Sequence, residues 1–85
     1  MDIQNAVALV TGANRGLGRH LAEELLKRGA RKVYAGVRRP ASVDLPGVVP
    51  LQMDITDPAS VAQAAKGAPD TTLLINNAAS ARTWD

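Results

Sequence analysis

The pattern of apolar and polar residues divides the chain into short blocks that predict alternating strands and helices. Four apolar runs, rich in β-branched residues, have the length of buried strands, at residues 7–11, 32–37, 48–53 and 71–75. After the first run, leucines recur at helical spacing, at Leu17, Leu21, Leu25 and Leu26. We therefore expect a first helix over residues 16–28 and a second, alanine-rich helix over residues 58–67.

Residues at the ends of these blocks support the predicted boundaries. Gly29 directly follows the first helix, which is the usual place for a glycine that ends a helix. Asp57 before Pro58 is typical of a helix N-cap followed by proline at the first helical position, and Gly67 ends the second helix. Residues 40–47 contain two prolines and predict a loop with about one helical turn, in place of a full crossover helix.

Strands that alternate with helices predict a parallel sheet of the α/β class, because parallel strands are joined by right-handed crossovers. A doubly wound sheet would place the four strands, numbered along the chain, in the order 3-2-1-4. The fourth strand, at residues 71–75, would then lie at an open edge of a partial sheet. We expect this exposed edge to reduce stability and to favour self-association of the chain.

Three glycines stand where the first strand ends and the first helix begins, at Gly12, Gly16 and Gly18. Glycine permits positive φ angles in a tight turn and lets the backbone approach a pyrophosphate closely. Unpaired amides and the positive end of the helix dipole would face the anion. The glycines therefore predict a phosphate-binding turn. The alternative is a turn in which they serve only the backbone conformation.

The glycine turn reads T-G-A-N-R-G-L-G over residues 11–18 and resembles the T-G-x-x-x-G-x-G signature of the short-chain dehydrogenase/reductase family. Segments 33–39, 53–56 and 74–79 fall in that family's order, so the resemblance covers nearly the whole chain. It implies a Rossmann-like, doubly wound parallel sheet, of which about four strands are present. It also implies that residues 1–85 are the N-terminal NAD(P)-binding portion of an oxidoreductase that exchanges hydride with a carbonyl or alcohol.

The resemblance implies particular contacts with the cofactor. The residues that we expect to bind it are Gly12, Asn14, Arg15, Gly16, Leu17, Gly18, Arg38, Asp54, Ile55, Asn77 and Ala78. Asp54 would accept a hydrogen bond from the adenine amino group, and Asn77 and Ala78 would border the ribose. Ala79 departs from the family's glycine, so we expect no contact through it. The alternative for Asp54 and the asparagines is a purely local role in turns.

The choice of cofactor depends on the residue at the end of the second strand, where a carboxylate would bind the ribose hydroxyls of NAD. Arg38 stands at this place, twenty residues beyond Gly18, with Arg39 beside it. Together with Arg15, Arg38 could form charge-assisted bonds to a 2′-phosphate, so the sequence favours NADP over NAD. Asp44 lies too far along the loop to replace the missing carboxylate. The alternative is that the arginines are solvated surface charges.

Composition excludes several other classes of protein. The chain has 85 residues, a formal net charge of +2 and no cysteine, which excludes disulfides and thiol nucleophiles and agrees with a cytoplasmic location. Basic residues are dispersed and aromatic residues make up 2%, so we expect no nucleic-acid partner. The apolar runs are too short for a membrane span or a signal peptide. No pattern of metal ligands is present.

Catalytic residues are not expected in this chain. The family's reaction needs a tyrosine and, four residues later, a lysine, but the tyrosine here, Tyr34, is followed by Arg38 at that spacing. We therefore expect the chain to bind a cofactor without catalysis, and whether it is an enzyme by itself stays open. One alternative is a noncatalytic nucleotide-binding or interaction module that is complete at 85 residues. Another is a decayed remnant without function.

Overall fold

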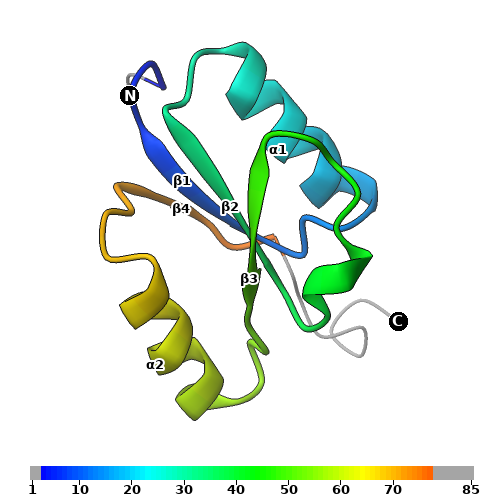
Figure 1. The fold of residues 1–85 in the computed structure, drawn as a ribbon, viewed down its shortest axis with the longest axis vertical. Helices are drawn as coiled ribbons and strands as arrows, with labels where there is room; N and C mark the ends of the chain where they lie inside the picture. Colours follow the sequence, from blue (N-terminus) through cyan, green and yellow to red (C-terminus); the bar gives the residue numbers. More distant parts are fainter. Residues whose placement is uncertain (1–2, 78–85) are drawn as a thin grey trace.

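The four apolar segments form one parallel sheet in the computed structural model, which describes residues 3–77 (Figure 1). The strands are β1 (Val7–Thr11), β2 (Lys32–Val37), β3 (Val48–Gln52) and β4 (Leu73–Ile75). They lie in the order β3-β2-β1-β4, and Leu9 of β1 has Tyr34 on one side and Leu74 on the other. The predicted α/β class and the strand order 3-2-1-4 are confirmed.

The sheet lies between two helices, α1 (Gly16–Lys27) and α2 (Pro58–Gly67), as Figure 1 shows. Side chains alternate between the two faces of a strand, so each face has its own buried cluster. The α1 side contains Ala8, Val10, Ala22, Leu25, Val33 and Ala35. The α2 side contains Val7, Leu9, Tyr34, Met53, Ala64 and Ala68. The central strands are thus buried on both faces, as their continuous apolar runs predict.

Helix α1 ends at Lys27, one residue before the predicted end. Arg28 is the C-cap, and Gly29 follows with a φ of 90°, a conformation that favours glycine. The amide of Gly29 donates to the carbonyl of Leu26, and the amide of Ala30 donates to that of Leu25. These two bonds form a Schellman motif, which satisfies carbonyl groups that a helix end would leave unpaired.

Helix α2 begins as the sequence predicts, because the side chain of Asp57 accepts a hydrogen bond from the amide of Ala59. Strand β4 is shorter than predicted and starts at Leu73 instead of residue 71. The amide and hydroxyl of Thr71 both donate to the carbonyl of Ala68, so Thr71 belongs to the turn after α2. Strand β3 likewise ends at Gln52, one residue early.

The connection between β2 and β3 contains one short 3-10 helix, η1 (Pro40–Ser42), and no full crossover helix. The loop after η1 covers part of the α1 face of the sheet, because Val43 and Leu45 pack against the cluster on that side. Gly47 closes this loop with a φ of 91° next to Leu26 of α1. The predicted loop with one helical turn is confirmed.

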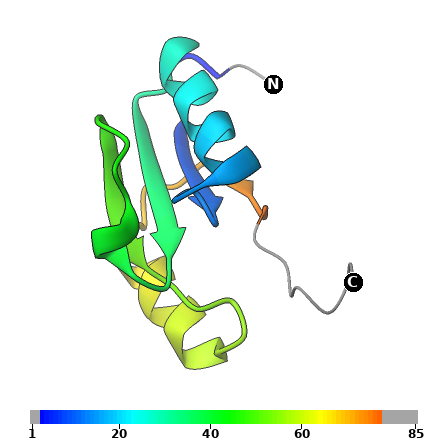
Figure 2. The same cartoon turned by 90° about the vertical axis from the view of Figure 1, so that its right-hand side faces the viewer.

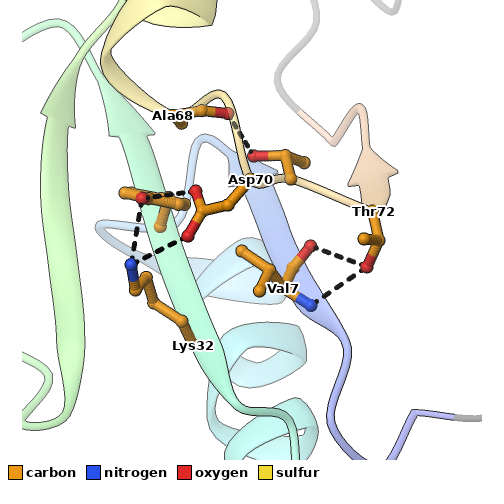
Figure 3. Close-up of polar contacts among 7 residues, drawn as sticks. Val7, Lys32, Ala68, Asp70 and Thr72 are labelled. Carbon is orange, nitrogen blue, oxygen red and sulfur yellow. Dashed lines mark hydrogen bonds and ion pairs between the residues drawn. The ribbon is translucent and has the colours of Figure 1, made fainter.

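A polar cluster lies at the amino ends of the strands (Figure 3). The ammonium of Lys32 donates to the carboxylate of Asp70 at 2.9 Å, and the hydroxyl of Tyr34 donates to the same carboxylate at 2.8 Å. The ammonium also lies 5.2 Å from the centre of the Tyr34 ring. Thr72 bonds both backbone groups of Val7 through its hydroxyl nearby. These contacts fix the turn after α2 against β2 and β1.

Candidate functional site: a dinucleotide-binding edge

The predicted binding residues gather at the carboxyl ends of the parallel strands. In Figure 2 the strands β1 and β2 point in the same direction, and the glycine turn follows β1 at this end. The chain moves from β1 outward to β2 and β3 and then returns to place β4 on the other side of β1. Ligands of open α/β sheets bind at such a switch point, outside the carboxyl ends of the strands.

The glycine turn has the conformation that the spacing predicts. Gly12 has a φ of 67° and Gly16 a φ of 60°, both in the left-handed region. A Cβ atom on Gly18 would lie 2.2 Å from the carbonyl oxygen of Gly12 and 2.6 Å from Nδ2 of Asn77. Gly18 therefore allows α1 to pack directly against the turn. A Cβ on Gly16 would meet nothing within 4 Å, so the mouth of the turn is open.

The start of α1 presents unpaired amides at this opening. The first helical hydrogen bond runs from the amide of Arg19 to the carbonyl of Arg15. Within the described residues, the amides of Gly16, Leu17 and Gly18 have no hydrogen-bond partner, and Arg15 provides no side-chain cap. Three free donors at the positive end of a helix dipole are the arrangement that binds phosphate.

The residues that flank these amides differ in exposure. Arg15 and Leu17 are exposed, and Asn14 is half-buried. Leu17, one of the residues predicted to bind the cofactor, is 64% exposed. Its position in the first turn carries it past the end of the sheet, whereas Leu25 two turns later is buried. Leu17 thus offers apolar surface beside the free amides.

Two arginines follow β2 at the same end of the sheet, and both Arg38 and Arg39 are exposed. Arg38 lies near enough to Asp54 for its positive charge to contribute to the lowered pKa of that carboxyl. The structure therefore brings together residues from the ends of β2 and β3.

Asp54 forms a local turn after β3. One carboxylate oxygen accepts from the amide of Thr56 at 3.0 Å and from its hydroxyl at 2.7 Å, and these bonds are the main cause of the lowered pKa. The amide of Asp54 donates to the hydroxyl of Ser60 at 2.8 Å. The next residue, Ile55, is 36% exposed. The carboxylate is thus ionised and held in place by its own turn.

The segment after β4 reaches the glycine turn. The hydroxyl of Thr11 at the end of β1 donates to the side-chain oxygen of Asn76 at 3.1 Å, and Asn77 approaches Gly18 as described above. Ala78 lies outside the described residues. The hydrogen bonds of Thr11 and Ser60 are not foreseen from the sequence, since neither residue has a distinctive spacing from its partner.

Other chemical groups are not assembled at this edge. Tyr34 bonds to Asp70 at the opposite end of the sheet. Among the described residues, no group of three or more His, Cys, Asp or Glu side chains is placed to hold a metal ion. In the same part of the chain, no helix is long and apolar enough to cross a membrane.

Together, the fold and the free amides define a class of protein, the dinucleotide-binding α/β domains. A sequence model of a family described as NAD(P)H-binding matches residues 12–83. The chain therefore belongs to this NAD(P)H-binding family, and it corresponds to the N-terminal cofactor-binding portion of short-chain dehydrogenases and reductases. The resemblance that the sequence motifs indicate is confirmed.

Three proteins illustrate this similarity. The crystal structure of a short chain dehydrogenase from Burkholderia cenocepacia J2315 in complex with NADP is 59% identical, with a TM-score of 0.86 over 92% of this chain and 34% of that chain. The crystal structure of 3-ketoacyl-(acyl-carrier-protein) reductase from Brucella melitensis complexed with NADH is 28% identical. Its TM-score is 0.75, over 85% of this chain and 34% of that chain. D-erythrulose reductase of Gallus gallus is 43% identical over 77 residues, which are 85% of this chain and 31% of the relative. The chain spans about one third of the length of these proteins.

Proposed function

We propose that the chain binds NADP in preference to NAD, as the cofactor-binding part of an oxidoreductase. The observation that carries this proposal is the set of free amides at the start of α1, with Arg15 as the N-cap and an exposed Arg38 at the carboxyl end of the neighbouring strand β2. The amides suit the pyrophosphate, and the guanidinium groups suit the extra 2′-phosphate of NADP. A carboxylate, which would favour NAD, is missing directly after β2.

The remaining contacts follow from the same edge of the sheet. Gly12 keeps the turn tight with its positive φ, Gly18 lets α1 pack against the turn, and the open side of Gly16 would admit the pyrophosphate to the amides. The ionised Asp54 has a second carboxylate oxygen that could accept from the adenine amino group, next to the apolar side chain of Ile55. Asn77 would border the ribose, and we propose the same for Ala78 from its place in the family's segment.

NADP(H), when bound, supplies the hydride that such an enzyme exchanges with a carbonyl or alcohol. The residues described here bind and orient the cofactor, and they include no tyrosine and lysine pair for proton transfer at this edge. We therefore propose that the chain alone binds without catalysis. We also propose a cytoplasmic location, which the lack of cysteine supports.

Calorimetric titration of the purified chain with NADP and with NAD tests the proposal. We expect NADP to bind more tightly than NAD. Arg38→Asp should weaken NADP binding by at least about tenfold, because the 2′-phosphate loses a cation and meets a carboxylate. The same substitution should leave NAD binding unchanged or strengthen it, because a carboxylate at this place can accept from the ribose hydroxyls. Arg31→Asp is the matched control, since Arg31 is exposed but precedes β2 at the opposite end of the sheet.

Two results would contradict the proposal. Equal affinity for the two cofactors in the wild-type chain would remove the preference for NADP. No heat with either cofactor, in a sample that circular dichroism shows to be folded, would exclude binding by this chain alone.

A further inference from the structure

An ion pair connects the start of α1 to the loop after η1, beside the proposed binding edge. Nε of Arg19 donates to Oδ1 of Asp44 at 3.0 Å. Arg19 directly follows Gly18, so this pair lies next to the free amides of the helix. The guanidinium also lies 3.7 Å from the carboxylate of Glu23, one turn further along α1.

The loop that carries Asp44 is held in place without this ion pair. Val43 and Leu45, on either side of Asp44, pack against the apolar cluster under α1, and Gly47 lies against Leu26. The pair itself is solvent-accessible, with 37% of the Arg19 side chain and 75% of the Asp44 side chain exposed. Exposed ion pairs contribute little to stability. The Arg19–Asp44 pair therefore matters more for the distribution of charge at the binding edge than for the folding of the loop.

The carboxylate of Asp44 is a negative charge beside the first turn of α1, whose free amides would bind a phosphate under the proposed function. It follows Arg38 and Arg39 along the same connection, and it contacts the first turn of the helix that presents the free amides. Without a neutralising partner, its charge would oppose the arginines that favour a 2′-phosphate. The guanidinium of Arg19 lowers the pKa of Asp44, first through its hydrogen bond and then through its charge, so the carboxyl group is ionised at neutral pH.

We propose that Arg19 is a specificity-determining residue, which neutralises Asp44 and so lets the site accept the 2′-phosphate of NADP. This inference rests on the proposed function and deepens it, because Arg19 acts through Asp44 and need not touch the cofactor. The other charged residues of the glycine turn, of α1 beside Arg19 and of the ends of β2 and β3 are Arg15, Glu23, Arg38, Arg39 and Asp54. The bond between Arg19 and Asp44 links α1 directly to the loop after η1.

A double-mutant cycle tests this inference, with the dissociation constants of NADP and NAD measured by calorimetry at low salt. Arg19→Met should weaken NADP binding about threefold to tenfold and change NAD binding by less than about twofold, because only NADP carries the extra charge. Asp44→Asn should leave NADP binding unchanged or strengthen it. The double variant should return close to the wild-type preference, since both charges are then absent.

A purely structural function of the pair predicts a different pattern. Arg19→Met, Asp44→Asn and the double variant would then weaken both cofactors alike, and this result would overturn the inference. Arg28→Met is the matched control, because Arg28 pairs with Glu24 at 3.8 Å at the far end of α1 and should leave both affinities unchanged. If the wild-type chain prefers NADP and Arg19→Met has the same ratio of NADP to NAD affinity, this inference alone is overturned. A wild-type chain that binds neither cofactor would overturn the proposed function as well.

Discussion

The two ends of the sheet differ in whether their polar groups are hydrogen-bonded within the protein. At the amino ends of the strands, Lys32, Tyr34 and Asp70 bond to one another, and each polar group has a partner within the protein. At the carboxyl ends, within the described residues, the first amides of α1 have none, and Arg15 and Arg38 are exposed. Groups that are paired internally hold a fold together, whereas ordered but unpaired donors are available to a ligand.

Backbone geometry explains why the ends differ. The start of a helix leaves amides without intrahelical partners, and α1 begins at the carboxyl end directly after the glycine turn. The turn after α2 lies at the amino end and carries Asp70, whose carboxylate accepts the donors that β2 offers there. The comparison therefore assigns polar groups that are paired within the protein to one end of the sheet and donors that are free for a ligand to the other. Substitutions at each end test this division.

The largest effect is expected from Gly18→Val at the carboxyl end. Its Cβ would lie 2.2 Å from a backbone oxygen of Gly12, so the helix or the turn must move. We expect a loss of about 3 kcal/mol in the free energy of unfolding and a loss of cofactor binding, measured by urea denaturation and calorimetry. Gly16→Ala is the control. An alanine at the positive φ of Gly16 should lower the free energy of unfolding by only about 1 kcal/mol, because its Cβ would meet no neighbour. Equal stability of Gly18→Val and wild type would refute the tight packing.

A smaller effect is expected from Asp70→Asn at the amino end, and it should depend on pH. The pKa of Asp70 is lowered from 3.8 because Lys32 and then Tyr34 donate to its carboxylate. A carboxyl group with a lowered pKa stabilises the folded state above its unfolded pKa, and this stabilisation is lost as the pH falls through the folded pKa. The variant should therefore be less stable than wild type at neutral pH, and the difference should shrink below pH 3.8.

Urea midpoints of both proteins at about pH 7 and about pH 3 measure this difference. Cofactor affinity at neutral pH should stay unchanged in Asp70→Asn, since Asp70 lies away from the binding edge. A large loss of NADP binding in this variant would contradict the division between the two ends. The pKa of Lys32 is raised from 10.5 by the same contacts, so the stabilisation that it provides should be lost as the pH rises through that raised pKa.

The smallest effect concerns the two side edges of the sheet. We propose that a second copy of the chain pairs with β4, because Leu74 is 60% exposed there and β4 contains no proline. Strand β3 at the other edge contains Pro50, which lacks an amide for pairing. Leu74→Lys should reduce weak self-association in sedimentation experiments. Val49→Lys, on β3, should not. A wild-type chain that stays monomeric at high concentration would refute this proposal.

Much of the fold could be predicted from the sequence because the signals are local. Apolar runs, the glycine spacing and the residues Asp57 and Gly29 act within a few positions of where they stand. The doubly wound arrangement of alternating strands and helices then gives the strand order. The glycine turn could be identified for the same reason. Its φ angles and free amides depend on the residues within it and on the helix that follows.

Contacts between distant segments were decided only by the tertiary structure. Arg19 and Asp44 are 25 residues apart, Lys32 and Asp70 are 38 apart, and Thr11 and Asn76 are 65 apart. No local pattern specifies which partner such a side chain meets, because the partner depends on strand register and on how each loop packs. The sequence by itself determined the strand, glycine turn and helix of the proposed binding edge, and the folded chain decided which charged side chains meet beside it.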